Sequence, residues 1–192
     1  MIRRNCILKK VLAILLMFTL LLCSCSSKTG EEELYSEDLI YRLSLCNLIM
    51  FDWNSPEEIN PDLICTIYYS SSEANKVSVQ YYNAETGESC FPKNLCEDYV
   101  KKYFDVSEEY LETAQAYNAE TQTYDTFTGF GGARFIDSIK PQKDGNDIFV
   151  YVNYYDPETE EIVAQSIIKL IKTSNGYRYG SCKYVTDKNA LV

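Results

Sequence analysis

The sequence contains no histidine in its 192 residues. Histidine is the usual general base near neutral pH and a common zinc ligand. Its absence therefore excludes Ser–His–Asp and Cys–His nucleophilic systems and histidine-bound zinc. Carboxylate chemistry remains, because the chain has 28 aspartate and glutamate residues, but no motif places any pair of them. We therefore predict no catalytic residue, no cofactor and no metal site.

A hydrophobic run long enough to cross a membrane is also missing. The longest apolar stretch, residues 11–22, would rise only about 18 Å as a helix, whereas a span needs about 20 residues. Four basic residues and no acid precede this stretch. A basic segment followed by a short apolar run is typical of a secretory signal peptide, and a permanent membrane span is the weaker interpretation.

The residues Leu22-Cys23-Ser24-Cys25 end this apolar run. Metal or redox use of the two cysteines is disfavoured, because a C-x-C pair lacks the two-residue gap of the familiar CxxC sites. The segment resembles the lipobox of bacterial lipoproteins, in which a small residue precedes a cysteine that receives a diacylglyceryl thioether before cleavage. Ser24 is such a residue and Leu22 is not, so the resemblance implies lipid attachment at Cys25 and not at Cys23.

The same resemblance implies a division of the chain into three parts. Residues 1–24 are a signal peptide that is removed, residues 25–33 are the lipidated cysteine and a short tether, and residues 34–192 are a single domain. The implied location is the extracytoplasmic face of the cell membrane, with the lipid bilayer as a partner through the Cys25 anchor. A diacylglyceryl group anchors stably, because each buried CH₂ contributes about 0.8 kcal/mol.

Positive charge is scarce in the chain, which carries 18 basic and 28 acidic residues and a net charge of −10. The segment 1–24 holds four of the basic residues and no acid, so the mature chain has a net charge of −14. A surface of this charge repels nucleic acid and anionic headgroups, and we predict no nucleic-acid partner.

Five cysteines remain in the predicted domain, at positions 46, 65, 90, 96 and 182. An odd number does not form a closed disulfide framework, although an extracytoplasmic location permits disulfides. A disulfide between Cys90 and Cys96 would close a tight loop. Buried free thiols are the alternative for all five.

Helical spacing dominates the first half of the predicted domain. It predicts helices over about 36–51, from Pro61 toward Tyr69, through residues 95–103 and over about 107–114. The segment around Ile64 also fits a strand. Alternation predicts a strand over 77–81.

From Tyr117 onward the pattern is that of β-strands. Four segments near 133–140, 147–155, 161–172 and 177–185 alternate or are β-rich, and two of their connections contain Asp-Gly or Asn-Gly, which favour tight hairpins. The second half therefore predicts a four-stranded antiparallel meander. With helices first, the fold class is α+β, with N-terminal helices packed on a curved antiparallel sheet.

A local pattern recurs at residues 82–86, 117–121 and 155–159, as Tyr-Asn-Ala-Glu-Thr twice and as Tyr-Asp-Pro-Glu-Thr. The flanking segments differ, so it does not indicate a repeat protein. We interpret the three copies as strand-ending turns in which Asn or Asp caps its own backbone; calcium loops need more oxygen ligands than they supply.

Tyrosine is in excess, with 17 residues. Along 148–155, alternation sends Phe149, Tyr151 and Tyr155 to the face opposite Val150 and its neighbours. One face must pack on the helices. The other is then an aromatic surface suited to a peptide, glycan or protein, or packing within a curved sheet. With Phe130, from a glycine-rich bend, these three residues form our candidate binding surface.

The order of helices followed by a long meander resembles the NTF2-like or cystatin-like superfamily, and residues 97–124 resemble segments of uncharacterised clostridial lipoproteins. The NTF2-like resemblance implies either a binding module or an enzyme that uses a carboxylate base with a tyrosine donor in a cone-shaped pocket. We expect a non-catalytic lipoprotein domain that binds an unknown protein, peptide or glycan. A small pocket enzyme using Asp/Glu and Tyr is the alternative.

Overall fold

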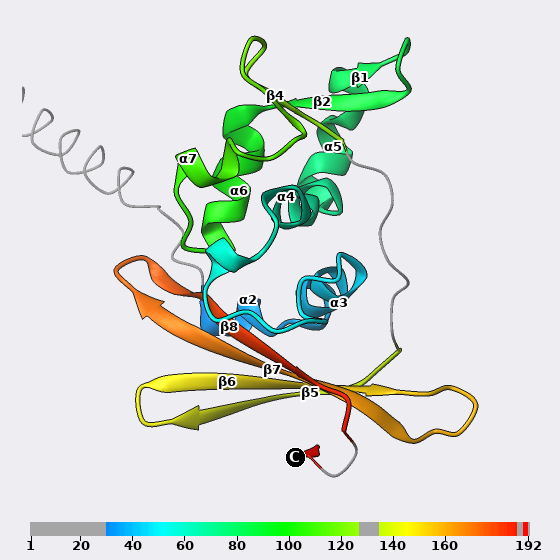
Figure 1. Cartoon of the computed structure of the whole chain (residues 1–192), viewed down its shortest axis with the longest axis vertical. Helices are drawn as coiled ribbons and strands as arrows, with labels where there is room; N and C mark the ends of the chain where they lie inside the picture. Colours follow the sequence, from blue (N-terminus) through cyan, green and yellow to red (C-terminus); the bar gives the residue numbers. More distant parts are fainter. Residues whose placement is uncertain (1–29, 127–134, 188–189, 192) are drawn as a thin grey trace, which may run out of the picture.

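The computed structural model describes residues 30–126, 135–187 and 190–191. Two antiparallel sheets of four strands each enclose a layer of helices (Figure 1). The α+β class is thereby confirmed. A second sheet that the sequence did not predict is built by short strands between the helices, on the far side of the helical layer.

The first helices lie directly on the larger sheet. They are α2 (Glu31–Leu34) and α3 (Glu37–Leu45), and a 3₁₀ turn η1 (Pro56–Glu58) follows. The helix predicted over 36–51 ends early, because Asn47 adopts a positive φ of 58°. The Leu48 and Asn47 amides donate to the carbonyls of Leu43 and Ser44 at 2.8 and 2.9 Å, as in a Schellman motif.

The next two helices are α4 (Pro61–Tyr69) and α5 (Ser72–Tyr81). Asn60 caps α4 by accepting from the Asp62 amide at 2.8 Å, so the helical reading of this segment is confirmed and the strand alternative is wrong. The strand predicted over 77–81 is also wrong, since these residues end α5. The Ser71 hydroxyl accepts from the Ala74 amide and starts a helix whose Val79 is 88% exposed, so the alternation there is not a buried face.

Helix α6 (Lys93–Tyr103) confirms the helix predicted through residues 95–103, and α7 (Glu108–Leu111) occupies the first part of the one predicted over 107–114. The smaller sheet covers these helices. Its strands are β1 (Tyr82–Asn83), β2 (Glu88–Pro92), β3 (Tyr117–Asn118) and β4 (Thr123–Asp125), in the order β1-β2-β4-β3.

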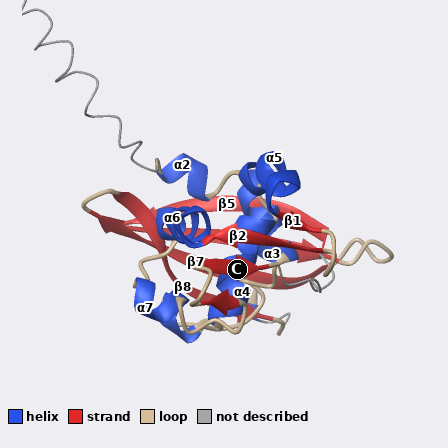
Figure 2. Ribbon diagram, turned by 90° about the horizontal axis from the view of Figure 1, so that it is seen from above, coloured by secondary structure: helices blue, strands red, loops and turns tan. Residues whose placement is uncertain are grey.

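The larger sheet is the predicted meander, in the order β5-β6-β7-β8. Its strands are β5 (Phe135–Asp144), β6 (Asp147–Tyr155), β7 (Ile162–Thr173) and β8 (Gly176–Val185). Gly145 and Gly176, at the two predicted hairpins, adopt φ values of 60° and 116°, which a glycine accepts without strain. Viewed from above, the strands of this sheet run beneath the helices (Figure 2).

The three Tyr-Asn/Asp turns have the predicted backbone capping. Asn83 Oδ1 accepts from the Glu85 amide at 2.9 Å, and Asn118 Oδ1 from the Glu120 amide at 3.0 Å. Asp156 Oδ1 accepts from the amide two residues on at 2.7 Å. Each is an Asx turn, so local side-chain chemistry alone accounts for the recurrence.

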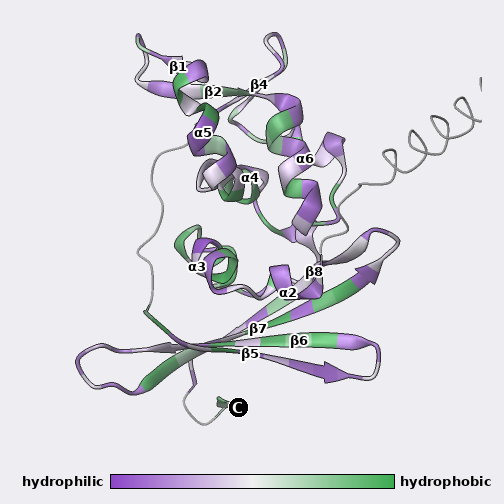
Figure 3. Cartoon of the chain, turned by 180° about the vertical axis from the view of Figure 1, so that it is seen from behind, coloured by the Kyte–Doolittle hydropathy of each residue, from purple (hydrophilic) through white to green (hydrophobic). Residues whose placement is uncertain are grey.

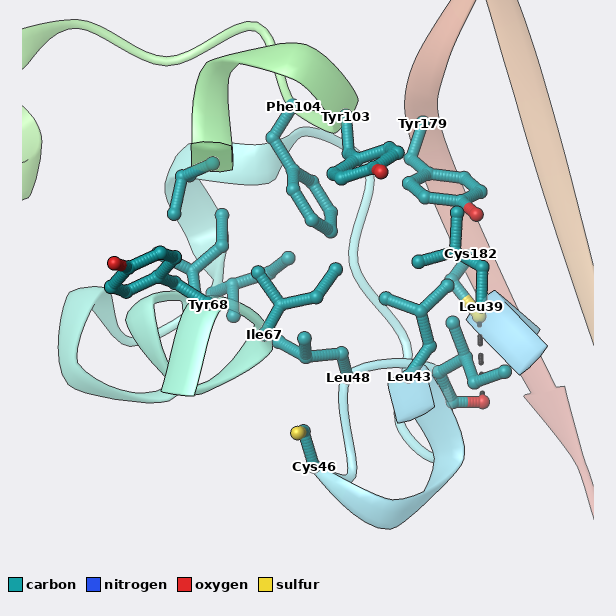
Figure 4. Packing of buried hydrophobic residues seen from close by; sticks show 14 of the residues in the cluster. Leu39, Leu43, Cys46, Leu48, Ile67, Tyr68, Tyr103, Phe104, Tyr179 and Cys182 are labelled. Carbon is teal, nitrogen blue, oxygen red and sulfur yellow. Dashed lines mark hydrogen bonds between the residues drawn. The ribbon is translucent and has the colours of Figure 1, made fainter. Parts of the chain in front are cut away.

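The inner face of the larger sheet is filled by the helices and the loop after α3. Leu39, Leu43 and Leu48 pack toward Tyr179 and Cys182 of β8 (Figure 4), and all five are at most 3% exposed. Trp53 exchanges two backbone hydrogen bonds of 2.9 Å with Cys182, which covers the outer edge of β8. Among the described residues, the space between this sheet face and the helices is therefore filled by core side chains.

Candidate binding surface

The face of the larger sheet that points away from the helices, here called the outer face, carries none of the described helices (Figure 1). Strand register places its side chains in rows across the four strands. The first row is Lys140, Tyr151, Ile167 and Lys183, and the second is Gln142, Phe149, Lys169 and Ser181. The third row is Ser138, Asn153, Gln165 and Val185.

Alternation along β6 assigns its faces as predicted. Ile148, Val150, Val152 and Tyr154 are at most 2% exposed and face the helices. Phe149, Tyr151 and Tyr155 are partly exposed on the outer face. The structure thus brings three of the four candidate residues to one face, and the fourth, Phe130, lies outside the described residues.

The aromatic side chains on this face have neighbours of different character. The Lys169 ammonium lies 5.9 Å from the centroid of the Phe149 ring, a cation–π distance. Tyr155 lies at the far end of the face, where its ring centroid is 5.6 Å from that of Phe135. Phe135 is 54% exposed, which makes it one of the most exposed large hydrophobic residues described.

Lysines are the members of the outer face that sequence reasoning missed. Lys140 and Lys183 are exposed and form no ion pair with any described residue, whereas Lys169 binds Asp147 at 2.7 Å. The first two rows contain no acidic residue, but the next row toward the β5–β6 hairpin pairs Asp144 with Asp147 on the same face. The hydrophilic end of β5 is visible in Figure 3. The alternation of each strand could have shown that these lysines lie on the outer face. Only the strand register shows that lysines from three different strands lie close together there.

The third row is polar and closed. The Gln165 amide donates to Asn153 Oδ1 at 2.7 Å, and the Asn153 amide donates to the Ser138 hydroxyl at 3.1 Å. Asn153 is 8% exposed and Gln165 is fully buried. After β8 the chain returns to this side of the sheet, where residues 190–191 lie (Figures 1 and 3). The centre of the third row is therefore closed to a ligand, whereas the first two rows and the adjoining pair Asp144 and Asp147 are open.

An enzyme of the predicted alternative type needs a buried carboxylate within reach of a tyrosine hydroxyl. Glu97 of α6 is 2% exposed, and the Tyr124 hydroxyl donates to it at 2.9 Å. Burial raises the pKa of Glu97 above its ordinary value, while the hydrogen bond from Tyr124 and the nearby lysines lower it. Sequence reasoning named the two residue types and did not identify this pair.

Two lysines already compensate the Glu97 carboxylate. Lys101 and Lys93 lie 3.5 and 4.0 Å from it, one on each of its oxygens. Both lysines also bind Glu108 of α7, at 2.8 and 3.4 Å, and Lys93 contacts Glu112. An open cleft of about 440 Å³ adjoins this cluster. The arrangement ties α7 to α6, and Glu97 itself is not an unpaired base.

The cysteines are free thiols, which was the alternative to a disulfide between Cys90 and Cys96. All five in the described residues are free, and four of them are buried. Cys90 is partly exposed on β2 and forms no disulfide with Cys96. Among the described residues, no group of three or more histidine, cysteine, aspartate or glutamate side chains is arranged to hold a metal ion.

Within the described ranges, no helix has the length and apolar composition to cross a membrane. No family model matches the chain, and no curated protein or solved structure matches it significantly.

Proposed function

We propose that this chain is a lipoprotein anchored at Cys25 on the extracytoplasmic face of the membrane, and that its domain is a non-catalytic binding module. The observation that carries the binding role is the outer face of the larger sheet. Partly exposed aromatic residues lie there among lysines, on the only face of this sheet that the helices leave uncovered. Aromatic rings supply contact area, and lysines supply donors for acidic or hydroxyl groups of a partner.

The alternative of a pocket enzyme is less well supported. Its required pair is present as Tyr124 and Glu97, but two lysines neutralise the carboxylate. A general base must be able to accept a proton from a bound substrate. Glu97 instead binds side chains of α6 and β4, and the lysines that bind it also bind α7. Its role is therefore structural.

The anchor is tested by replacing Cys25 with serine. We expect the variant to lose labelling by a fatty-acid probe and to leave the membrane fraction, while Cys23→Ser keeps both. Retained labelling of Cys25→Ser, or loss of labelling only in Cys23→Ser, would overturn the assignment.

The binding role is tested by pull-down from envelope extract with the full protein and two matched variants. Tyr151→Ser removes an aromatic ring from the centre of the outer face, and Tyr41→Ser removes a 48% exposed ring from α3. We expect captured partners to be lost with Tyr151→Ser alone. Equal capture by both variants would show that binding does not use the outer face.

A further inference from the structure

The outer face carries charges of both signs, and they lie in different rows. The first row has a lysine at each edge of the sheet, Lys140 on β5 and Lys183 on β8. The row toward the β5–β6 hairpin, here called the fourth row, pairs Asp144 of β5 with Asp147 of β6. The second row, which contains Phe149, lies between these two rows. Each of them is two residues away from it along a strand, which is about 6.7 Å.

Two other basic residues on this face are already paired within the chain. Lys169 of the second row binds Asp147 at 2.7 Å. Arg178, which continues the fourth row on β8, binds Asp105 at 2.5 Å. The exposed charges of these rows that form no ion pair with any described residue are Lys140, Lys183 and Asp144. They are available to pair with charges on another molecule.

A two-fold axis along the second row makes these charges complementary between two copies of the sheet. When a second copy is turned about this axis and placed face to face, each strand lies opposite its own counterpart and the first row lies opposite the fourth. Asp144 of each copy then faces Lys140 of the other, because both lie on β5 at equal distances from the axis. On β6, Tyr151 faces Asp147, a carboxylate to which its hydroxyl can donate.

Apolar side chains meet at the centre of the same arrangement. Phe149 lies on the axis and faces its own counterpart. On β7, Ile167 of the first row faces Ile171 of the fourth, and both are partly exposed in one copy. The closed third row lies opposite the hairpin turns of the other copy, where that sheet ends. An apolar centre with charges around it is the usual composition of an interface between proteins.

Charge favours this axis over other two-fold arrangements of the same faces. An axis along the strands sets β5 against β8, so that Lys140 of each copy faces Lys183 of the other. An axis along the first row sets each of these lysines against its own counterpart. With the axis along the second row, the like charges that meet are Lys169 with its counterpart and Arg178 with Lys183. Lys169 and Arg178 already bind acids of their own chain, so this arrangement has the least repulsion.

We propose that the outer face is an interface between two copies of this chain, packed sheet on sheet about a two-fold axis along the second row. The proposal rests on the proposed binding role of the outer face and identifies its partner as a second copy. The three open rows measure roughly 19 by 20 Å, which is less than the area of about 800 Å² per partner in a standard interface. The dimer is therefore weak and reversible, and anchoring of both copies in one membrane favours it by raising their effective concentration.

The test uses the full protein in detergent, with micelles in large excess so that two copies do not share a micelle by chance. Sedimentation equilibrium measures the dissociation constant of the dimer. Lys140→Glu and Asp144→Lys each turn both Lys140–Asp144 contacts into repulsions, so we expect either change to raise the dissociation constant about tenfold or more. Lys76→Glu, which makes the same change in net charge at an exposed position of α5, should leave it unchanged.

Mixing the two variants tests the axis itself. In a mixed pair the two substituted residues face each other with opposite charges, and the unchanged Asp144 of one copy faces the unchanged Lys140 of the other. We expect the mixture to associate as tightly as the wild type, although neither variant does so alone. A mixture that associates no better than the separate variants would overturn the proposal. So would a wild type that is monomeric at about 1 mM, the effective concentration that tethering provides.

The outcomes separate this inference from the proposed function. Tyr151→Ser should weaken the dimer, whereas Tyr41→Ser should not. If the wild type is monomeric and Tyr151→Ser still loses a different protein in the pull-down, the binding role stands and the second copy is refuted as its partner. If the wild type is monomeric and Tyr151→Ser captures the same proteins as the wild type, the binding role of the outer face fails as well.

Discussion

The contact between Tyr124 and Glu97 yields a prediction that separates a structural carboxylate from a catalytic one. Tyr124 is fully buried, and its hydroxyl donates to a carboxylate that is 2% exposed. Tyr124→Phe removes only this donor and keeps the ring, which packs 5.0 Å from the Tyr117 ring. The variant therefore measures the hydrogen bond and little else.

The expected cost follows from the burial of the pair. A buried hydrogen bond to a charged group is worth about 1.5–3 kcal/mol. Both lysines remain within 4.0 Å of Glu97 and keep part of the compensation, so we expect a loss of about 2 kcal/mol in the free energy of unfolding at neutral pH. For a domain of this size that loss lowers the melting temperature by about 4–8 °C.

The cost should depend on pH in a defined direction. Burial raises the pKa of Glu97 in the folded protein, so its contribution to stability is greatest at low pH and is lost as the pH rises through that pKa. The Tyr124 hydrogen bond lowers the pKa, and its removal raises the pKa further. The difference between wild type and variant is therefore largest where Glu97 is ionised, and it shrinks as the pH falls and the carboxyl group is protonated.

Urea unfolding followed by the fluorescence of Trp53, the single tryptophan, measures this difference at neutral and acidic pH. Tyr117→Phe is the control, because its hydroxyl contacts an exposed Gln122 amide at 2.8 Å. A Tyr124→Phe variant no less stable than this control at neutral pH would refute the reasoning. So would a loss of stability that does not change with pH.

Two other predictions concern the sheets. In Gly180→Ala the new Cβ would lie 2.5 Å from Ile171 Cγ2, so we expect a loss of about 1–3 kcal/mol in the free energy of unfolding. Gly180→Ala should reduce the free energy of unfolding by less in an Ile171→Ala background than in the wild type. An equal reduction in the two backgrounds would contradict the clash. A hydrogen bond with Asp125, together with burial, raises the pKa of Cys90 to about 11. Alkylation of this thiol should accelerate up to about that pH, and Asp125→Asn should shift the onset lower; an unchanged onset would exclude the carboxylate as the cause.

The sequence was sufficient for features that depend on neighbouring residues. The start of α4 is set by Asn60 and Pro61, and the turns at Asn83, Asn118 and Asp156 are set by a side chain that binds its own backbone. The meander and the faces of β6 could also be predicted, because side chains alternate along every strand and an apolar series marks the buried face. The proposed lipid address likewise rests on a short contiguous segment.

Tertiary structure decided what depends on contacts between distant segments. Glu97 is one of 28 acids in the sequence, and only the packing of α6 against β4 and α7 buries it beside Tyr124.

The lysines of the outer face belong to this second class. They come from β5, β7 and β8, which are separated in the chain, and strand register alone sets them in rows around Tyr151. Alternation predicts which side chains of a strand lie on each face of the sheet, because it is a property of a single strand. The charge of the whole surface is a property of all four strands, so it appears only when the sheet is assembled.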